Sequence, residues 1–352
     1  MREELLKRLS NADAIASKEQ ELRDILYEEL HDSCDEIAYD HLGSMLFRSK
    51  GSVENPVKLM FAAHMDEVGF LVRHISDIGF LYLIAVGGVL DKSKDMQMVR
   101  VTTNDHNKVY GLLNVTRNSN GTIQDMYVDI GCESREEVAK LGIEIGNMVT
   151  FASTCRQLNG TSVYAGKAMD DRSGCYVLCE AMKRIHKRIH ESEIWMAATS
   201  SEEVGVRGGK TASYRIDPDI IVAIDVANHP ELVRNYTNHR LLGKGCMIVH
   251  YDKTMAPNEK LLAFVKNTAK KYDIPYQCDM FSGGGTDAGN GHLIRSGKLA
   301  IVIGIPLRCC HGAWSLVHAE DIDHTVELVV ELATTIRKKE YESFIDFQGG
   351  RN

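Results

Sequence analysis

Ile220-Ile-Val-Ala-Ile-Asp225 is a run of five apolar residues that ends in a single carboxylate. Such a continuous apolar run is typical of a strand that is buried on both faces of a parallel sheet. A carboxylate at the end of so apolar a segment is costly to bury without a cationic partner. We therefore expect Asp225 to face a cation at the carboxyl end of a central strand.

Apolar strand-like runs recur on both sides of this segment. They are Val57–Ala63, Glu193–Ala198 and Leu299–Ile305. From about residue 165 such runs alternate with helical patterns, which predicts an α/β layer with a mostly parallel sheet. Residues 69–164 differ, because short β-rich pieces are separated there by Gly, Asn and Asp. We predict one α/β domain in two segments, 1–66 and 165–352, with a β-rich inserted domain at 67–164.

Composition excludes several classes of protein. The 352 residues are 44% hydrophobic and 26% charged, as in an ordinary soluble globular protein. The formal net charge of -8 and the lack of a Lys/Arg-rich run argue against a nucleic-acid partner. No apolar run reaches the ~18 residues of a membrane-spanning helix, and the N-terminus lacks the apolar core of a secretory signal. Nine cysteines without a CxxC pair suit reduced thiols, so we expect a cytoplasmic protein with no membrane partner.

Acidic or histidine residues follow the apolar segments at five places. They are His64-Met-Asp66, Asp170-Asp171, Glu202-Glu203, Asp225 and His311. In open parallel sheets, ligands bind outside the carboxyl ends of the strands, so these groups can meet although they are distant in sequence. Two imidazoles and three carboxylates without thiolate suit a pair of Zn²⁺, Co²⁺ or Mn²⁺ ions. The pattern therefore predicts a two-metal hydrolytic site.

The position of each group suggests its role. Asp170 begins a helical pattern and is the best candidate to bridge two ions ~3.5–4 Å apart. His64 and Asp66 point to the same side of an extended strand, so Asp66 could hydrogen-bond the imidazole nitrogen that does not bind metal. Of the adjacent Glu202 and Glu203, one can bind metal while the other takes a proton from water.

Each fragment alone is weak, because a single acidic pair is usually solvated surface and a single His is usually a satisfied polar residue. Their shared position after apolar runs favours the metal interpretation. Cys309 and Cys310 are more simply explained as small buried apolar residues than as soft metal ligands. Gly283-Gly-Gly-Thr-Asp287 is either a wall of the substrate pocket or a flexible loop.

Together the motifs resemble the FrvX and tetrahedral-assembly (TET) aminopeptidases, dinuclear metallopeptidases of the glutamyl aminopeptidase type in clan MH. The matching segments span most of the chain, and in order they are Ala63-His-Met-Asp-Glu-Val-Gly69, Gly166-Lys-Ala-Met-Asp-Asp-Arg172, Ser200-Ser-Glu-Glu-Val-Gly205, Ala223-Ile-Asp225, Gly283-Gly-Gly-Thr-Asp-Ala288 and Ile305-Pro-Leu-Arg308 with His311. The resemblance implies a catalytic domain of the zinc-peptidase type, an insert that mediates dimerisation, and dimers that assemble into a dodecamer. His311-Gly-Ala-Trp-Ser315 departs from the His-Ser-Pro-x-Glu-like segment of many relatives.

The resemblance also implies roles for single residues. Two sets of metal ligands are implied, namely His64, Asp170 and Asp225 for one ion and Asp170, Glu203 and His311 for the other. Glu202 is then the general base, Asp66 orients His64, and the Asp170-Asp171 peptide is cis. Three residues of the glycine-rich segment are implied to bind substrate: Gly285, Thr286 and Asp287.

We therefore expect an aminopeptidase that uses two divalent ions to hydrolyse N-terminal residues of short peptides. Zn or Co are the first candidates for these ions, and Mn is the next. Two alternatives stay open. A metal-dependent deacylase of N-acyl amino acids would use a similar site, and a non-catalytic peptide-binding or assembly protein could keep the same fold. A glycosidase is disfavoured. Its two working carboxylates lie ~5 to 9.5 Å apart on either side of the sugar, and adjacent residues such as Glu202 and Glu203 are seldom placed in that way.

Overall fold

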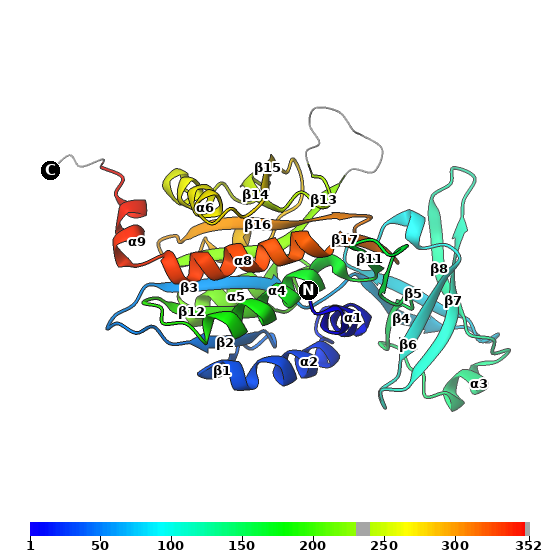
Figure 1. Ribbon diagram of the computed structural model, residues 1–352. Helices are drawn as coiled ribbons and strands as arrows, with labels where there is room; N and C mark the ends of the chain where they lie inside the picture. The colour runs from blue at the N-terminus through cyan, green and yellow to red at the C-terminus, as the bar shows by residue number, and fades with distance from the viewer. Residues whose placement is uncertain (230–239, 349–352) are drawn as a thin grey trace.

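The computed structural model describes residues 1–229 and 240–348, which divide into two bodies (Figure 1). A large mixed sheet with helices on both faces forms the first body. A closed barrel, drawn mostly in cyan at the right of Figure 1, forms the second. Among the described helices, none combines the length and the apolar character that a membrane crossing requires. The mixed α/β fold that the sequence predicts is confirmed.

Four parallel strands form the centre of the large sheet. In sheet order they are β12 (Glu193–Thr199), β3 (Lys58–His64), β13 (Ile220–His229) and β16 (Leu299–Arg308). Side chains alternate between the two faces along each strand. On β3, Leu59 and Phe61 belong to one apolar core, whereas Met60 belongs to the core on the opposite face. Both faces are therefore buried, as continuous apolar runs predict.

The edges of this sheet are antiparallel. One edge consists of β1 (Glu36–Tyr39) and β2 (Met45–Ser49), and the other of β17 (Ser315–His318), β11 (Val163–Gly166) and β10 (Arg156–Gln157). Off this path, β14 (Cys246–Tyr251) pairs with β16 and with β15 (Tyr276–Met280). The expected parallel pairing thus holds at the centre. Short connections explain the antiparallel pairs β1–β2, β10–β11 and β16–β17, because a short connection cannot join parallel strands.

Helices cover both faces of the sheet. One layer contains α1 (Glu3–Asn11), α2 (Gln20–Leu30), α4 (Met169–Ile185), α6 (Glu259–Lys271), α8 (Ala319–Thr335) and α9 (Lys338–Ile345). The opposite layer contains α5 (Arg207–Ile216) and the short α7 (Asp287–Gly291). Because α4 is buried along most of its length and packs on β3 and β13, the start of α4 is held at the carboxyl ends of the central strands.

Six antiparallel strands close into the barrel in the order β4-β5-β8-β7-β6-β9. Their bounds are β4 (Gly69–Ile75), β5 (Leu81–Val86), β6 (Gln97–Thr102), β7 (Lys108–Arg117), β8 (Ile123–Asp129) and β9 (Met148–Phe151), with α3 (Arg135–Lys140) before β9. An apolar core of its own fills the barrel, where Phe70 and Phe151 meet edge to face at 5.8 Å. Because β10 and β11 belong to the large sheet, we keep the inserted domain as a proposal and place its strands between residues 69 and 151.

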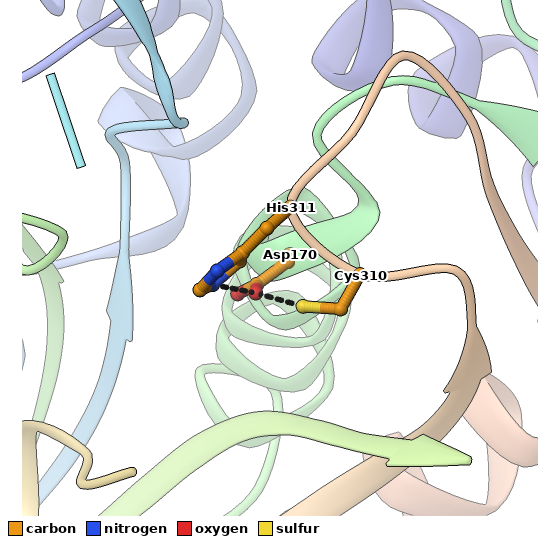
Figure 2. Close-up of side chains that lie close together, drawn as sticks. All are labelled: Asp170, Cys310 and His311. Atoms are coloured by element: carbon orange, nitrogen blue, oxygen red, sulfur yellow. Dashed lines mark hydrogen bonds and ion pairs between the residues drawn. The ribbon is translucent and has the colours of Figure 1, made fainter. Parts of the chain in front are cut away.

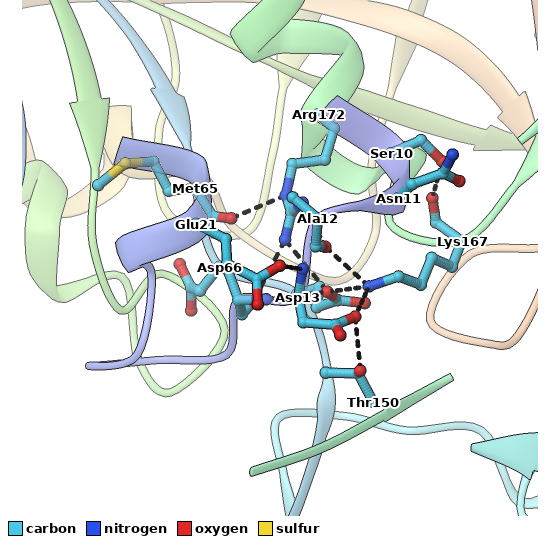
Figure 3. A network of polar contacts seen from close by, with 12 residues as sticks. Ser10, Asn11, Ala12, Asp13, Glu21, Met65, Asp66, Thr150, Lys167 and Arg172 are labelled. Carbon is cyan, nitrogen blue, oxygen red and sulfur yellow. Dashed lines mark hydrogen bonds and ion pairs between the residues drawn. The ribbon is translucent and has the colours of Figure 1, made fainter. Parts of the chain in front are cut away.

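A buried charge cluster joins the two bodies (Figure 3). Asp13, between α1 and α2, is 1% exposed. Its carboxylate accepts hydrogen bonds from Arg100 of β6 at 2.6 and 2.7 Å and from Thr150 of β9 at 2.7 Å. Lys108 and Lys167 pair with the same carboxylate at 2.8 and 2.9 Å. Burial alone would raise the pKa of Asp13, but Lys167 and Arg100 outweigh burial and hold this pKa well below its usual range.

The same cluster reaches the start of α4. Lys167 and Arg172, both fully buried, hold Oε1 of Glu67 at 2.5 and 3.2 Å. Arg172 also donates hydrogen bonds to the backbone carbonyls of Leu9 and Met65. The network therefore connects the N-terminal segment, the loop after β3 and the first turn of α4.

We expect Asp13→Asn to lower the free energy of unfolding by about 3–5 kcal/mol, because it leaves buried cations without their partner. Folding lowers the pKa of Asp13, so its contribution is present above the unfolded pKa near ~4 and is lost as the pH falls below that value. Urea unfolding at neutral and at acidic pH measures the difference in the free energy of unfolding between Asp13→Asn and the wild type. This difference should be smaller in acid.

The matched control is Glu28→Gln, which removes an exposed ion pair with Arg8 and should cost less than ~1 kcal/mol. Equal unfolding midpoints for Asp13→Asn and the wild type at neutral pH would contradict the role of this cluster.

Candidate active site

The central strands bring the predicted residues to one end of the sheet. His64 is the last residue of β3, and Asp225 lies in the neighbouring β13. Glu202 and Glu203 follow β12, and His311 follows β16. All of them line one pocket of about 640 Å³, a volume typical of small-molecule sites. The strand topology therefore places side chains from four separate segments around a common space.

Asp170 lies between two imidazoles in this pocket. Its Oδ1 is 3.0 Å from Nε2 of His64, and its Oδ2 is 3.2 Å from Nε2 of His311. The Asp170-Asp171 peptide bond is cis, and both residues have non-helical backbone angles. The Asp171 carboxylate accepts a hydrogen bond from the N–H of Gly174 at 3.0 Å and caps the helix that follows. A carboxylate with one oxygen on each histidine has the geometry of a bridging ligand.

Two more carboxylates lie on either side of Asp170. Asp225 has an oxygen within 4.8 Å of donor atoms of both His64 and Asp170. Glu203 Oε2 is 3.6 Å from Nε2 of His311. The donor atoms thus form two groups that share Asp170.

Asp66 makes a different contact from the one that the sequence predicts. Nδ1 of His64 is 2.9 Å from the backbone carbonyl oxygen of Asp66, whereas the nearest carboxylate oxygen is 3.7 Å away. That carboxylate instead accepts hydrogen bonds from the backbone N–H groups of Glu202 at 2.9 Å and Glu203 at 3.1 Å. The expectation fails because β3 ends at His64, so Asp66 does not continue the strand. Asp66 holds the His64 ring through its main chain and both glutamates through its side chain.

Burial and repulsion between neighbouring carboxylates raise the pKa values of Asp225, Glu203 and Glu202. Burial and the charge of Asp170 raise the pKa of Asp225 to about 7 and that of Glu203 to about 8. Burial also raises the pKa of Glu202 well above its ordinary value. It would raise the pKa of Asp170 too, but hydrogen bonds to His311 and then His64 hold that pKa well below its usual range.

The pKa values of the two histidines are raised, which favours their cationic form. Burial would lower the pKa of His311, but the hydrogen bond to Asp170 and the charges of Asp170 and Glu203 together outweigh burial and raise this pKa to about 9. The pKa of His64 is raised well above its ordinary value in the same way. Four carboxyl groups line the pocket beside these imidazoles: Asp170, Glu202, Glu203 and Asp225. Oxygen and nitrogen donors of this kind fit divalent cations, which take the place of the protons on such groups, so the residues present fit a pair of metal ions.

The glycine-rich segment forms another wall of the pocket. Gly285 and Thr286 line it, as their expected substrate contact requires. Asp287 departs from that expectation, because it is 3% exposed at the start of α7 and accepts a hydrogen bond from the Thr199 hydroxyl. Asp287 therefore supports the wall from inside the protein.

Two further residues reach the pocket without having been predicted to do so. Cys310 directs its Sγ at Oδ2 of Asp170 from 2.7 Å (Figure 2), and its place beside His311 was the available signal. Arg240 pairs with Asp279 at 2.8 Å and lies over the ring of Phe281 at 4.4 Å. A single arginine outside any motif carries no comparable signal in the sequence.

Known proteins resemble this chain over nearly its whole length. A family model described as M42 glutamyl aminopeptidase matches residues 43–328. The lysyl aminopeptidase of Pyrococcus furiosus is 32% identical over 352 residues, which cover 96% of this chain and 98% of the relative.

Solved structures agree with this likeness. The TET aminopeptidase of the marine sediment archaeon Thaumarchaeota archaeon SCGC AB-539-E09 has a TM-score of 0.92 at 34% identity and covers 97% of this chain and 99% of its own. The Pyrococcus horikoshii TET1 peptidase, which can assemble into a tetrahedron or a large octahedral shell, has a TM-score of 0.85 at 28% identity and covers 95% of this chain and 99% of its own.

We expect Asp225→Asn to stabilise the protein in chelator and to reduce the stabilisation by Zn²⁺. Folding raises the pKa of Asp225 to about 7, so the folded state holds this proton more tightly than the unfolded state. The group therefore lowers stability as the pH rises from about 4 through 7, and the neutral amide removes that cost together with one oxygen donor.

Thermal unfolding at about pH 8, with EDTA and with Zn²⁺, measures both effects. The exposed Asp77→Asn serves as the matched control. A rise in Tm with Zn²⁺ that is as large in Asp225→Asn as in the wild type would exclude Asp225 as a ligand.

Proposed function

Because the chain belongs to the M42 glutamyl aminopeptidase family, we propose that it is a metal-dependent aminopeptidase that releases N-terminal residues from short peptides. The position of Asp170 carries the proposal. One of its oxygens lies on each of two histidines, in a pocket that Glu202 also lines. A two-metal hydrolytic centre needs ligands shared between its ions and a base beside the attacking water, and Asp170 and Glu202 suit these two roles.

Two donor sets support the binding of two divalent ions. His64, Asp170 and Asp225 would hold one ion, and Asp170, Glu203 and His311 would hold the other. Ions in such a site supply Lewis-acid chemistry, because they polarise a carbonyl group and lower the pKa of water. Oxygen and nitrogen donors suit Zn²⁺ or Co²⁺, and also Mn²⁺.

Glu202 is the proton carrier of the proposed mechanism. Burial raises its pKa well above the ordinary value, so its carboxylate is basic enough to take a proton from the attacking water. The same carboxyl group then passes that proton to the leaving amine. Asp66 holds the main chain of Glu202 at 2.9 Å, which positions this carboxylate over the pocket. The main-chain oxygen of Asp66 fixes the His64 ring at the same time.

The charge of the pocket supports a substrate with a free N-terminus. The ammonium group of a peptide is a cation, which a carboxylate of this pocket could pair with. A volume of about 640 Å³ admits a few residues rather than a folded chain. Gly285 and Thr286 would border the first side chain of the bound peptide. An N-acyl amino acid has no such cation, which makes a deacylase the weaker alternative.

We also propose that the chain forms homo-oligomers through its barrel. Large apolar side chains are exposed there, among them Ile84, Met98 and Ile145 at 48%, 53% and 69%. We propose these residues as part of the interface, because contiguous exposed apolar patches mark interaction surfaces. Light scattering would count the copies, with a dodecamer as the expectation. The nine cysteines all lie in the described part of the chain and form no disulfide there, which supports the reducing cytoplasm as the proposed location.

Glu202→Gln should lower kcat on aminoacyl-p-nitroanilides by about 10²–10⁴-fold, because the amide cannot carry the proton. Metal content and Tm should stay at wild-type values, whereas the neighbouring Glu203→Gln should lose metal affinity. Steady-state kinetics together with metal analysis of both variants measure this contrast. Full turnover by Glu202→Gln would remove Glu202 from the mechanism.

The same assay separates the alternatives when N-acetyl amino acids are tested beside the aminoacyl substrates. Hydrolysis of the N-acetyl compounds alone would favour a deacylase. Binding of peptides without hydrolysis of either class would favour a non-catalytic binding protein.

A further inference from the structure

Cys310 lies in the loop after β16, directly before His311, and is 8% exposed. Its Sγ is 2.7 Å from Oδ2 of Asp170, and Nε2 of His311 is 3.2 Å from the same oxygen (Figure 2). Donor atoms of the three residues all lie within 4.8 Å of one another. A sulfur, an oxygen and a nitrogen therefore surround one small space.

The backbone of this loop produces the convergence. Side chains of consecutive residues point in opposite directions along an extended strand, so Cys310 and His311 would diverge if β16 continued. Cys309 and His311 instead have φ angles of 63° and 58°, in the left-handed region that few non-glycine residues adopt. The resulting turn directs both side chains at Asp170, as Figure 2 shows.

We propose that Cys310 is an additional protein ligand of the ion held by Asp170 and His311, so that this position is a mixed sulfur, nitrogen and oxygen site. The inference rests on the proposed two-metal function. When the ion binds, the thiol proton leaves to solvent and a sulfur–metal bond forms. A thiolate ligand favours Zn²⁺ and Co²⁺ over Mn²⁺, so Cys310 would set the metal preference of this chain.

A purely structural thiol is the competing explanation, since buried free cysteines often act as small apolar residues. The surroundings of Cys310 argue against it. Buried Cys175 nearby directs its Sγ to the backbone carbonyl of His64 at 3.2 Å, which offers no metal position. Cys310 instead contacts the carboxylate oxygen that His311 also faces.

Absorption spectroscopy of the Co²⁺-loaded protein tests this assignment without measuring activity. Chelator-treated wild type, Cys310→Ser, Cys310→Ala and the adjacent control Cys309→Ser are each loaded with Co²⁺. Wild type and Cys309→Ser should show a near-ultraviolet thiolate-to-Co²⁺ charge-transfer band, and both Cys310 variants should lack it. A wild type that binds Co²⁺ without the band, or a band that survives in the Cys310 variants, would overturn the assignment.

Metal competition gives the second readout. Cys310→Ser should bind Zn²⁺ at least about tenfold more weakly than the wild type, with a smaller change for Mn²⁺. Equal losses for the two metals would overturn the proposed preference. Failure of the wild type to bind Co²⁺ at all would overturn the proposed function together with this inference. Bound Co²⁺ and hydrolysed peptide without the charge-transfer band would overturn the Cys310 assignment alone.

Discussion

The burial of several carboxyl groups in one pocket is the constraint on which the rest of this structure depends. Four carboxyl groups and two imidazoles line the same space. Burial raises the pKa of three of them, and Asp170 stays ionised because each of its oxygens has an imidazole partner. Ionising these buried groups without a partner is costly, so we expect the pocket to be most stable when it holds cations. The metal binding that we propose and the lower stability that we expect without metal would have the same cause.

The fold meets this constraint with supports that lie outside the pocket. Parallel strands deliver His64 and Asp225 from neighbouring positions in the sheet. The loop after β3 is held from two directions, because Asp66 binds the main chain of the two glutamates while Glu67 pairs with buried Lys167 and Arg172. The charge cluster that anchors the barrel therefore also holds the segment that orients the active-site residues.

Much of the site could be predicted from the sequence because its residues follow apolar runs whose strand ends must meet. Asp225 is the clearest example, since its cost of burial is visible in the residues before it. The sequence could not predict the side-chain positions that depend on contacts formed only in the folded structure. The contact of Asp66 depends on where β3 ends. Asp287 points inward because it begins a short helix. The position of Cys310 depends on an unusual turn.

Diffraction from crystals grown with Zn²⁺, measured at the zinc absorption edge, would test the two-ion centre most directly. Two anomalous peaks ~3.5–4 Å apart are expected, one beside His64 and Asp225 and the other beside Glu203 and His311, with Asp170 between them. A pocket without a peak, or zinc bound only at sites remote from Asp170, would contradict it.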